Sequence, residues 1–198
     1  MHRLFAYVNE HYLKNDNQEN TDFNWFVLTD DDTYVVVDNL RLLLRQRTQQ
    51  QPYYYGLVAQ QKYVEPSASL SLSRYNFQRL MLVWSKCHGE SERSHAADVW
   101  LGQCMAHANI TPWFGLDNHK HLYSKFGPQE TLNLNEERRA YYWQYYYQWR
   151  VFISKNLSCC SDNFIGFHYV SPQMIRTVDF LLYGVHPFSD RSLWKNAS

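Results

Sequence analysis

Apolar side chains recur at the spacing of an amphipathic helix in several stretches of the chain. This spacing predicts helices over residues 4–14, from Tyr34 to about Gln46, after Ser73, over residues 95–108 and after Ser171–Pro172. Asp32 or Thr33 is suited to cap the second of these helices. Ser171 and Pro172 combine a common N-cap residue with a common first-turn residue, so they mark the start of the last helix.

Three short runs lack the helical spacing and predict strands, at residues 25–28, 53–58 and 164–170. The first run ends abruptly in Thr29 and three aspartates, as a buried strand does when it emerges from a sheet. Strand, acidic turn and helix then follow one another, which is a frequent layout of ligand sites in open α/β sheets. Residues 127–137 read as a loop, and residues 141–149 form an unusually aromatic block.

Composition limits what the chain can bind. With 198 residues, 45% of them hydrophobic, there is enough apolar material for one globular core, so we expect one domain or most of one. Nineteen basic and nineteen acidic residues cancel and are interspersed, which argues against a general electrostatic attraction to nucleic acid. The apolar runs are much shorter than the roughly 20 residues that cross a bilayer, so we expect no anchor or export signal within this chain.

The triplet Asp30-Asp31-Asp32 is the most informative local feature. Acids at positions i and i+2 of an extended segment point the same way and can jointly face a hard divalent cation. Such an Asp-x-Asp pair is able to hold a metal ion against a nucleotide diphosphate. A solvated turn or a helix N-cap is the alternative explanation, and the residues alone leave both open.

The signature of the core 1 β1,3-galactosyltransferases is closely similar to residues 25–40, Trp-Phe-Val-Leu-Thr-Asp-Asp-Asp-Thr-Tyr-Val-Val-Val-Asp-Asn-Leu. Two further segments resemble this family in the right order, Asp98–Cys104 and the double cysteine Cys159-Cys160 with the following Phe167–Val170. The resemblance implies an α/β fold of the GT-A glycosyltransferase type, a mixed sheet flanked by helices. It assigns residues 1–188 to a partial catalytic domain, lacking the first nucleotide-binding strands, and residues 189–198 to a tail.

The same resemblance implies the reaction. An inverting, metal-dependent enzyme of this family moves galactose from UDP-galactose, in β1,3 linkage, to N-acetylgalactosamine O-linked to a glycoprotein. The implied cofactor is Mn²⁺, and the implied partners are UDP-galactose, the glycoprotein acceptor and a second copy in a homodimer, with no nucleic acid. The implied location is the Golgi lumen or membrane, reached through an N-terminal anchor that this chain does not contain.

The resemblance also assigns roles to residues. Asp30 and Asp32, with His168, would bind the metal ion, and Asp31 would join the two aspartates at the nucleotide. Asp98 would be the general base that deprotonates the acceptor hydroxyl. The acceptor would lie against the aromatic side chains Trp143, Tyr145 and Tyr147, whose flat faces suit sugars. Without the family pattern, His168 reads as a packed core histidine, Asp98 as a helix-surface acid and many of these rings as core.

The four cysteines allow disulfides without requiring them. By resemblance, Cys87 would pair with Cys104, while Cys159 and Cys160 would form a vicinal pair or take other partners. Four thiols in a cytosolic protein are the alternative.

The sequence departs from the family at residues 66–71. The family has a Gly-Gly-Ala-Gly turn there, whereas this chain has no glycine, and serine and leucine resist the positive φ that glycine allows. Two other functions therefore remain as hypotheses. One is a catalytically inactive relative that acts as a chaperone or binding protein for an active transferase, and the other is a sugar-binding module. Retention of all three aspartates favours the transferase.

Overall fold

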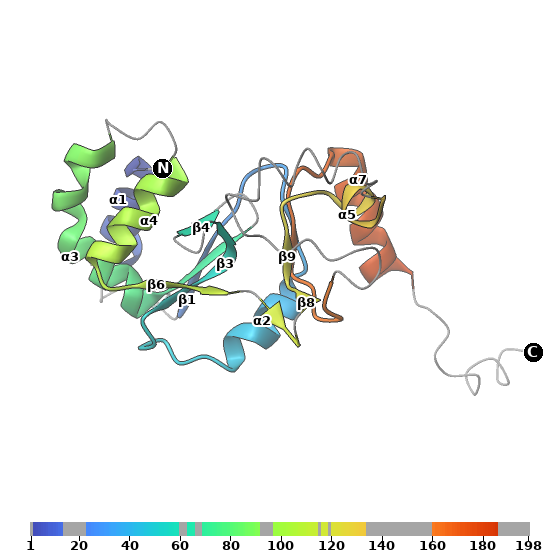
Figure 1. Cartoon of the computed structure of the whole chain (residues 1–198), viewed down its shortest axis with the longest axis horizontal. Coiled ribbons are helices and arrows are strands. Elements are labelled where there is room, and N and C mark those ends of the chain that lie inside the picture. Colours follow the sequence, from blue (N-terminus) through green and yellow to red (C-terminus); the bar gives the residue numbers. More distant parts are fainter. Residues whose placement is uncertain are drawn as a thin grey trace, which may run out of the picture.

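The structure is a computed structural model that describes residues 2–13, 23–59, 63–65, 69–91, 97–114, 116–118, 120–133 and 160–185. Helices and strands are interspersed along the chain (Figure 1). The helices are α1 (His2–Val8), the π-helix η1 (Asn9–Leu13), α2 (Val37–Arg45), α3 (Arg74–Ser91), α4 (Ala97–His107), α5 (Pro128–Asn133), α7 (Pro172–Asp179) and the π-helix η4 (Phe180–Gly184). The strands are β1 (Trp25–Leu28), β2 (Tyr34–Val35), β3 (Tyr53–Ala59), β4 (Tyr63–Glu65), β5 (Leu70–Ser73), β6 (Thr111–Phe114), β7 (Leu116–Asp117), β8 (Lys120–His121), β9 (Tyr123–Ser124) and β10 (Gly166–Phe167).

The larger sheet is mixed. Within the described residues its strands run in the order β1-β5-β3-β4, with β6 also paired to β3. The β1–β5, β5–β3 and β3–β4 pairs are antiparallel, and the β3–β6 pair is parallel. The expected mixed sheet flanked by helices is therefore present, and β1, which leads into the acidic turn, lies at the end of the strand order.

One face of the larger sheet is covered by α1, α3 and α4, which lie together at the left of Figure 1. The rings of Phe5 and Trp84 stack with centroids 5.3 Å apart, and Trp84 meets Trp100 edge to face. Aromatic side chains of this size bury more apolar surface than any others. This helix side of the sheet therefore holds the main hydrophobic core.

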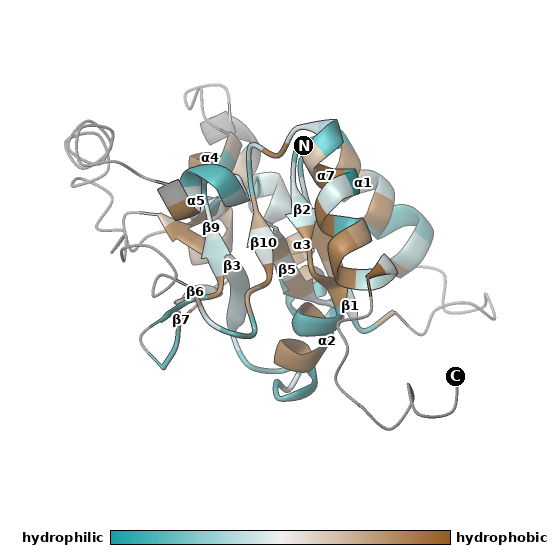
Figure 2. Ribbon diagram, turned by 90° about the vertical axis from the view of Figure 1, so that its right-hand side faces the viewer, coloured by the Kyte–Doolittle hydropathy of each residue, from teal (hydrophilic) through white to brown (hydrophobic). Residues whose placement is uncertain are grey.

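The other face of the larger sheet carries α2 and a smaller sheet, in which β10 lies between β2 and β9 (Figure 2). Strand β10 pairs antiparallel with β2 and parallel with β9. Leu40, Leu43 and Leu44 of α2 pack with Tyr55 of β3 and with the fully buried Ile165. This second core fixes the smaller sheet against the larger one.

Several helices and strands predicted from the sequence are confirmed. Strands β1 and β3 and helices α3 and α4 lie where the pattern placed them. The predicted helix over residues 4–14 is divided into α1 and η1. Ser171 accepts a hydrogen bond from the backbone N–H of Met174 (3.2 Å), so it caps α7 as predicted.

Other predictions of local structure are wrong. The helix expected from Tyr34 begins only at Val37, because Tyr34 and Val35 pair with β10, and its N-cap is Val36 rather than Asp32 or Thr33. The predicted loop over residues 127–137 contains α5. The predicted strand over residues 164–170 is reduced to Gly166–Phe167. β1 is not fully buried either, since Val27 is 46% exposed.

The turn without glycine also differs from expectation. Residues 66–68 lie outside the described residues, but Ser69 is fully buried and has a φ of 83°. The carbonyl oxygen of Ser69 would lie 2.3 Å from a Cβ atom on Gly56, whose own φ is 153°. A glycine in β3 therefore provides the close backbone approach here, and a serine adopts the left-handed conformation that was expected to resist it.

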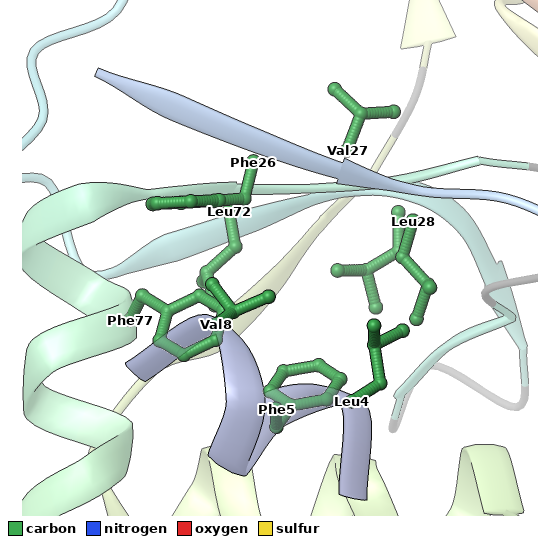
Figure 3. A pocket seen from close by; sticks show the side chains of 9 residues that line it. Leu4, Phe5, Val8, Phe26, Val27, Leu28, Leu72 and Phe77 are labelled. Atoms are coloured by element: carbon green, nitrogen blue, oxygen red, sulfur yellow. The ribbon is translucent and has the colours of Figure 1, made fainter. Parts of the chain in front are cut away.

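A pocket between α1 and the β1–β5 pair is lined only by apolar side chains: Leu4, Phe5, Val8, Phe26, Val27, Leu28, Leu70, Leu72 and Phe77 (Figure 3). It offers no polar side chain to a nucleotide or a sugar. No helix among the described residues is long and apolar enough to cross a membrane.

Candidate metal centre

The acidic triplet lies on the connection between β1 and β2. The N–H of Thr33 donates a hydrogen bond to the carbonyl of Asp30 (3.3 Å) and closes a turn. The N–H of Val170 donates to the carbonyl of Asp32 (2.8 Å). Together with the pairing of β2 and β10, this bond holds the turn beside the segment that follows β10, and that segment carries His168.

Asp30, Asp32 and His168 converge. His168 Nε2 lies 3.2 Å from Asp32 Oδ1 and 4.0 Å from Asp30 Oδ2. One ligand atom from each residue lies within 4.8 Å of the other two. His168 is buried, Asp32 is half-buried and Asp30 is exposed, so the trio opens toward solvent on its carboxylate side. Asp31 is exposed and is not part of the trio.

The donor set of this trio fits a transition-metal ion. Two carboxylates with one imidazole suit Mn²⁺ better than Ca²⁺, which prefers oxygen ligands alone. The His168 ring stacks on Tyr169, with centroids 3.8 Å apart and an interplanar angle of 24°. The nitrogen of His168 that faces the carboxylates is Nε2. The other ring nitrogen, Nδ1, is buried and has no hydrogen-bond partner among the described residues. The trio therefore meets the chemical requirements of a metal site.

Asp98 is half-buried in the first turn of α4, where its Oδ1 accepts a hydrogen bond from the N–H of Val99 (2.9 Å). Gly102 follows one turn later on the same face of the helix. A Cβ atom on Gly102 would lie 2.3 Å from Tyr63 Cβ, so α4 approaches β4 as closely as a glycine permits. The pKa of Tyr63 is raised by burial and, to a smaller extent, by the charge of Asp98. Asp98 therefore lies on the side of α4 that meets β4.

Sequence reasoning missed two charged residues beside the trio. Glu65 at the end of β4 is 4% exposed, and its Oε1 accepts a hydrogen bond from Lys125 Nζ at 3.0 Å. Burial raises the pKa of Glu65, while Lys125 and, more weakly, His168 act to lower it and Asp98 acts to raise it. The Glu65 carboxylate therefore lies near enough to both Asp98 and His168 to sense their charges. A single glutamate and a single lysine far apart in the sequence carry no local signal for such a pair.

The disulfide expected between Cys87 and Cys104 is not formed. Both cysteines are fully buried thiols in the packed pair α3 and α4, and Cys87 Sγ contacts the carbonyl of Val83 in its own helix at 3.6 Å. The alternative of four thiols is also wrong, because Cys160 is bonded in a disulfide. Cys159 lies outside the described residues, as do the proposed acceptor residues Trp143, Tyr145 and Tyr147.

A second pocket lies beside α2, where the guanidinium of Arg47 stacks 4.5 Å from the ring centre of Trp113. Asn39, Asp117 and Asn163 also line it, so it is more polar than the pocket beside β1. None of the trio residues lines either pocket. The candidate chemistry of the described residues therefore lies at the trio and its neighbours on β4 and α4.

Comparison with known proteins identifies relatives of this chain. Residues 2–80 match the model of the Fringe-like family, and this segment contains Asp30 and Asp32. Over 189 residues, 91% of the chain, the sequence is 31% identical to glycoprotein-N-acetylgalactosamine 3-beta-galactosyltransferase 1 of Xenopus laevis. The alignment covers 49% of that protein, so the chain spans about half the length of the curated relative. The chain is therefore a relative of this galactosyltransferase with a Fringe-like segment at residues 2–80, which confirms the resemblance drawn from its sequence.

Proposed function

We propose that the chain is the metal-binding and catalytic part of a galactosyltransferase that uses UDP-galactose and Mn²⁺. The acceptor of this reaction is the 3-hydroxyl of N-acetylgalactosamine on a glycoprotein. The observation that carries the proposal is the convergence of Asp30, Asp32 and His168 on one small volume. The relative's name supplies the class of reaction, and the mixed sheet with its acidic turn supports a GT-A-like fold over residues 1–188.

In this mechanism Asp30, Asp32 and His168 would hold the metal ion, which would supply positive charge to neutralise the diphosphate of the donor. Asp98 acts on the acceptor and takes the proton of its 3-hydroxyl onto a carboxylate oxygen. The acceptor oxygen forms a bond to the anomeric carbon of galactose as the bond from that carbon to the diphosphate breaks. Because attack comes from the face opposite the departing UDP, the configuration inverts without a covalent enzyme intermediate.

The aromatic residues Trp143, Tyr145 and Tyr147 remain our proposed acceptor contacts. The Golgi lumen as the location, an N-terminal membrane anchor in a longer protein and a homodimer also remain proposals. The alternative of an inactive relative that binds an active transferase has one feature of the sequence in its favour, the absence of glycine from residues 66–71, where the family carries a glycine-rich turn.

The test is transfer of radiolabelled galactose from UDP-galactose to a peptide bearing N-acetylgalactosamine, in the presence of Mn²⁺. We compare the wild type with Asp32→Asn, which keeps the size of the side chain but removes its charge. Loss of a metal ligand should lower incorporation by about 100-fold or more, because even indirect partners of metal ligands contribute 10–100-fold. Asp38→Asn is the matched control, because Asp38 is an exposed acid paired with Arg41 on α2.

Mn²⁺ affinity, followed by electron paramagnetic resonance, should fall in Asp32→Asn and stay unchanged in Asp38→Asn. Equal incorporation by the wild type and Asp32→Asn would remove the proposed role of this site. A wild-type chain that binds Mn²⁺ but transfers no galactose would favour the inactive relative.

A further inference from the structure

Lys125 directly follows β9, and His168 directly follows β10, the neighbouring strand of the smaller sheet. The parallel β9–β10 pair matches Tyr123 with Gly166 and Ser124 with Phe167. The N–H of His168 donates to the carbonyl of Ser124 (3.2 Å), which is one of the hydrogen bonds of the Ser124–Phe167 pair. Lys125 and His168 therefore each follow the last paired residue of their strands, and the two segments stay in contact beyond that pair, because a Cβ atom on Gly127 would lie 3.0 Å from the carbonyl oxygen of Tyr169. This arrangement puts the segment that carries the lysine beside the segment that carries the metal-facing histidine.

Glu65 sets the position of that lysine. Its Oε1 accepts the hydrogen bond from Lys125 Nζ, and its side chain is only 6% exposed. The second oxygen, Oε2, is buried and has no hydrogen-bond partner among the described residues. A buried carboxylate that lost its cation would be strongly destabilised, so the pair holds the lysine side chain in one place. Lys125 itself keeps 19% of its side chain exposed, so a ligand in solvent is able to reach it.

The charges on this side of the sheet are arranged for an anion that binds together with a metal ion. The trio carries two carboxylates, and the ammonium of Lys125 lies against Glu65, a carboxylate near enough to His168 to sense its charge. A lysine and a divalent cation at neighbouring positions repel each other unless an anion bridges them. A diphosphate carries enough negative charge to contact both, and lysine binds phosphate as a point charge.

We propose that Lys125, positioned by Glu65, contacts the diphosphate of the nucleotide donor when the donor binds at the trio. This inference rests on the proposed function, in which the trio holds the metal ion of a nucleotide sugar. Lys125 is a binding residue in this scheme, whereas Glu65 acts through Lys125 and is a positioning residue.

The proposal predicts effects of opposite sign on two ligands. Removing the charge of Lys125 should strengthen the binding of Mn²⁺ alone, because a repulsive neighbour is lost, and should weaken the binding of a diphosphate. A purely structural role of the ion pair predicts no such division, because a distorted site would bind both ligands more weakly.

The experiment compares Glu65→Gln with the double variant Glu65→Gln/Lys125→Met, which differ only in the lysine. Glutamine keeps an oxygen that accepts from Lys125, and the double variant leaves no buried carboxylate without a partner, so the comparison does not depend on the folding of Lys125→Met alone. Both proteins are titrated with Mn²⁺ alone, and with inorganic pyrophosphate or UDP at saturating Mn²⁺. Thermal unfolding of each variant checks that the fold is intact.

We expect the double variant to bind Mn²⁺ at least as tightly as Glu65→Gln, and to bind pyrophosphate and UDP about tenfold more weakly or worse. Tenfold is the lower end of what a hydrogen bond to a charged group contributes. Equal pyrophosphate affinity in the two variants, or a parallel loss of affinity for Mn²⁺ and pyrophosphate, would overturn the assignment of Lys125.

The outcome is separable from that of the transfer assay. Lysine-dependent binding of pyrophosphate by a chain that transfers no galactose would support the assignment and reject the transferase. Transfer of galactose with a lysine-independent affinity for UDP would reject the assignment alone. A wild-type chain that binds no pyrophosphate in the presence of Mn²⁺ would overturn both.

Discussion

Gly102 sets the distance between α4 and β4, and Gly102→Ala tests whether that distance matters for function. The added Cβ atom would lie 2.3 Å from Tyr63 Cβ and 3.2 Å from Tyr63 Cγ. Carbon atoms in contact are normally about 3.5–4.0 Å apart, so roughly 1 Å or more of separation must be created. Tyr63 Cβ is fixed to the backbone of β4 and cannot rotate away. The helix itself therefore has to move.

The cost in stability is the difference between two effects. Overpacking a buried site costs about 1–3 kcal/mol. Alanine gains about 1 kcal/mol over glycine in a helix interior. We therefore expect the free energy of unfolding to fall by no more than about 2 kcal/mol, which lowers the Tm of a chain of this length by about 4–8 °C at most. The variant should fold at room temperature.

The cost in activity should be larger than the cost in stability. Asp98 lies one helical turn before Gly102 and moves with it, and a misplacement of about 1 Å can lower a rate by roughly 100-fold. The assay is kcat for galactose transfer, with Mn²⁺ affinity measured in parallel. Mn²⁺ affinity should be unchanged, because the segment after β10 and the connection after β1 supply the trio and α4 does not.

Gln103→Ala is the matched control for this prediction. It introduces alanine at the adjacent, exposed position of the same helix, where no neighbour in β4 has to move. A folded Gly102→Ala protein with the kcat of the wild type would refute the link between the packing of α4 and the position of Asp98.

Three further predictions concern stability. Burial lowers the pKa of His121 from its ordinary 6.5, so this residue contributes stability above pH 6.5 that is lost as the pH falls. The Tm of His121→Gln should therefore fall less than that of the wild type between pH 7.5 and pH 5, and an equal fall would contradict this role of His121. Ser171→Ala removes the N-cap of α7 and should lower the free energy of unfolding by about 1 kcal/mol, measured by urea denaturation, whereas Ser171→Asp should keep the cap. Asn76 is fully buried and donates hydrogen bonds to the carbonyls of Gln51 and Tyr53. Asn76→Ala should therefore lower the free energy of unfolding by roughly 1–3 kcal/mol in the same assay, and a loss well below that range would show that water replaces these bonds.

The sequence predicted the helices and strands whose apolar spacing is strong. In α3, Phe77, Leu80 and Trp84 face one core, so their helical period is visible without any structure. The strands β7, β8, β9 and β10 contain two residues each, and such short segments show no period at all. The start of α2 was misplaced for a related reason, because the pairing of Tyr34 and Val35 with β10 overrides their local fit to a helix.

The cysteines show the limit of arguing from resemblance. The spacing of Cys87 and Cys104 matched a family bridge, and α3 and α4 do pack together, yet both residues remain thiols in the structure. A disulfide requires a narrow geometry of two Cβ atoms, and neither spacing nor resemblance fixes that geometry.

The sequence by itself determined which acids stand beside the sheet, because the triplet Asp30-Asp31-Asp32 begins within two residues of the apolar run that forms β1. It also determined which helices bury an apolar face. Only the tertiary structure decided that His168 meets these carboxylates, and that Lys125 and Glu65 pair beside them. These contacts join β4, β9, β10 and the turn after β1, and they depend on strand register, which non-local hydrogen bonds and core packing fix and which no single segment encodes.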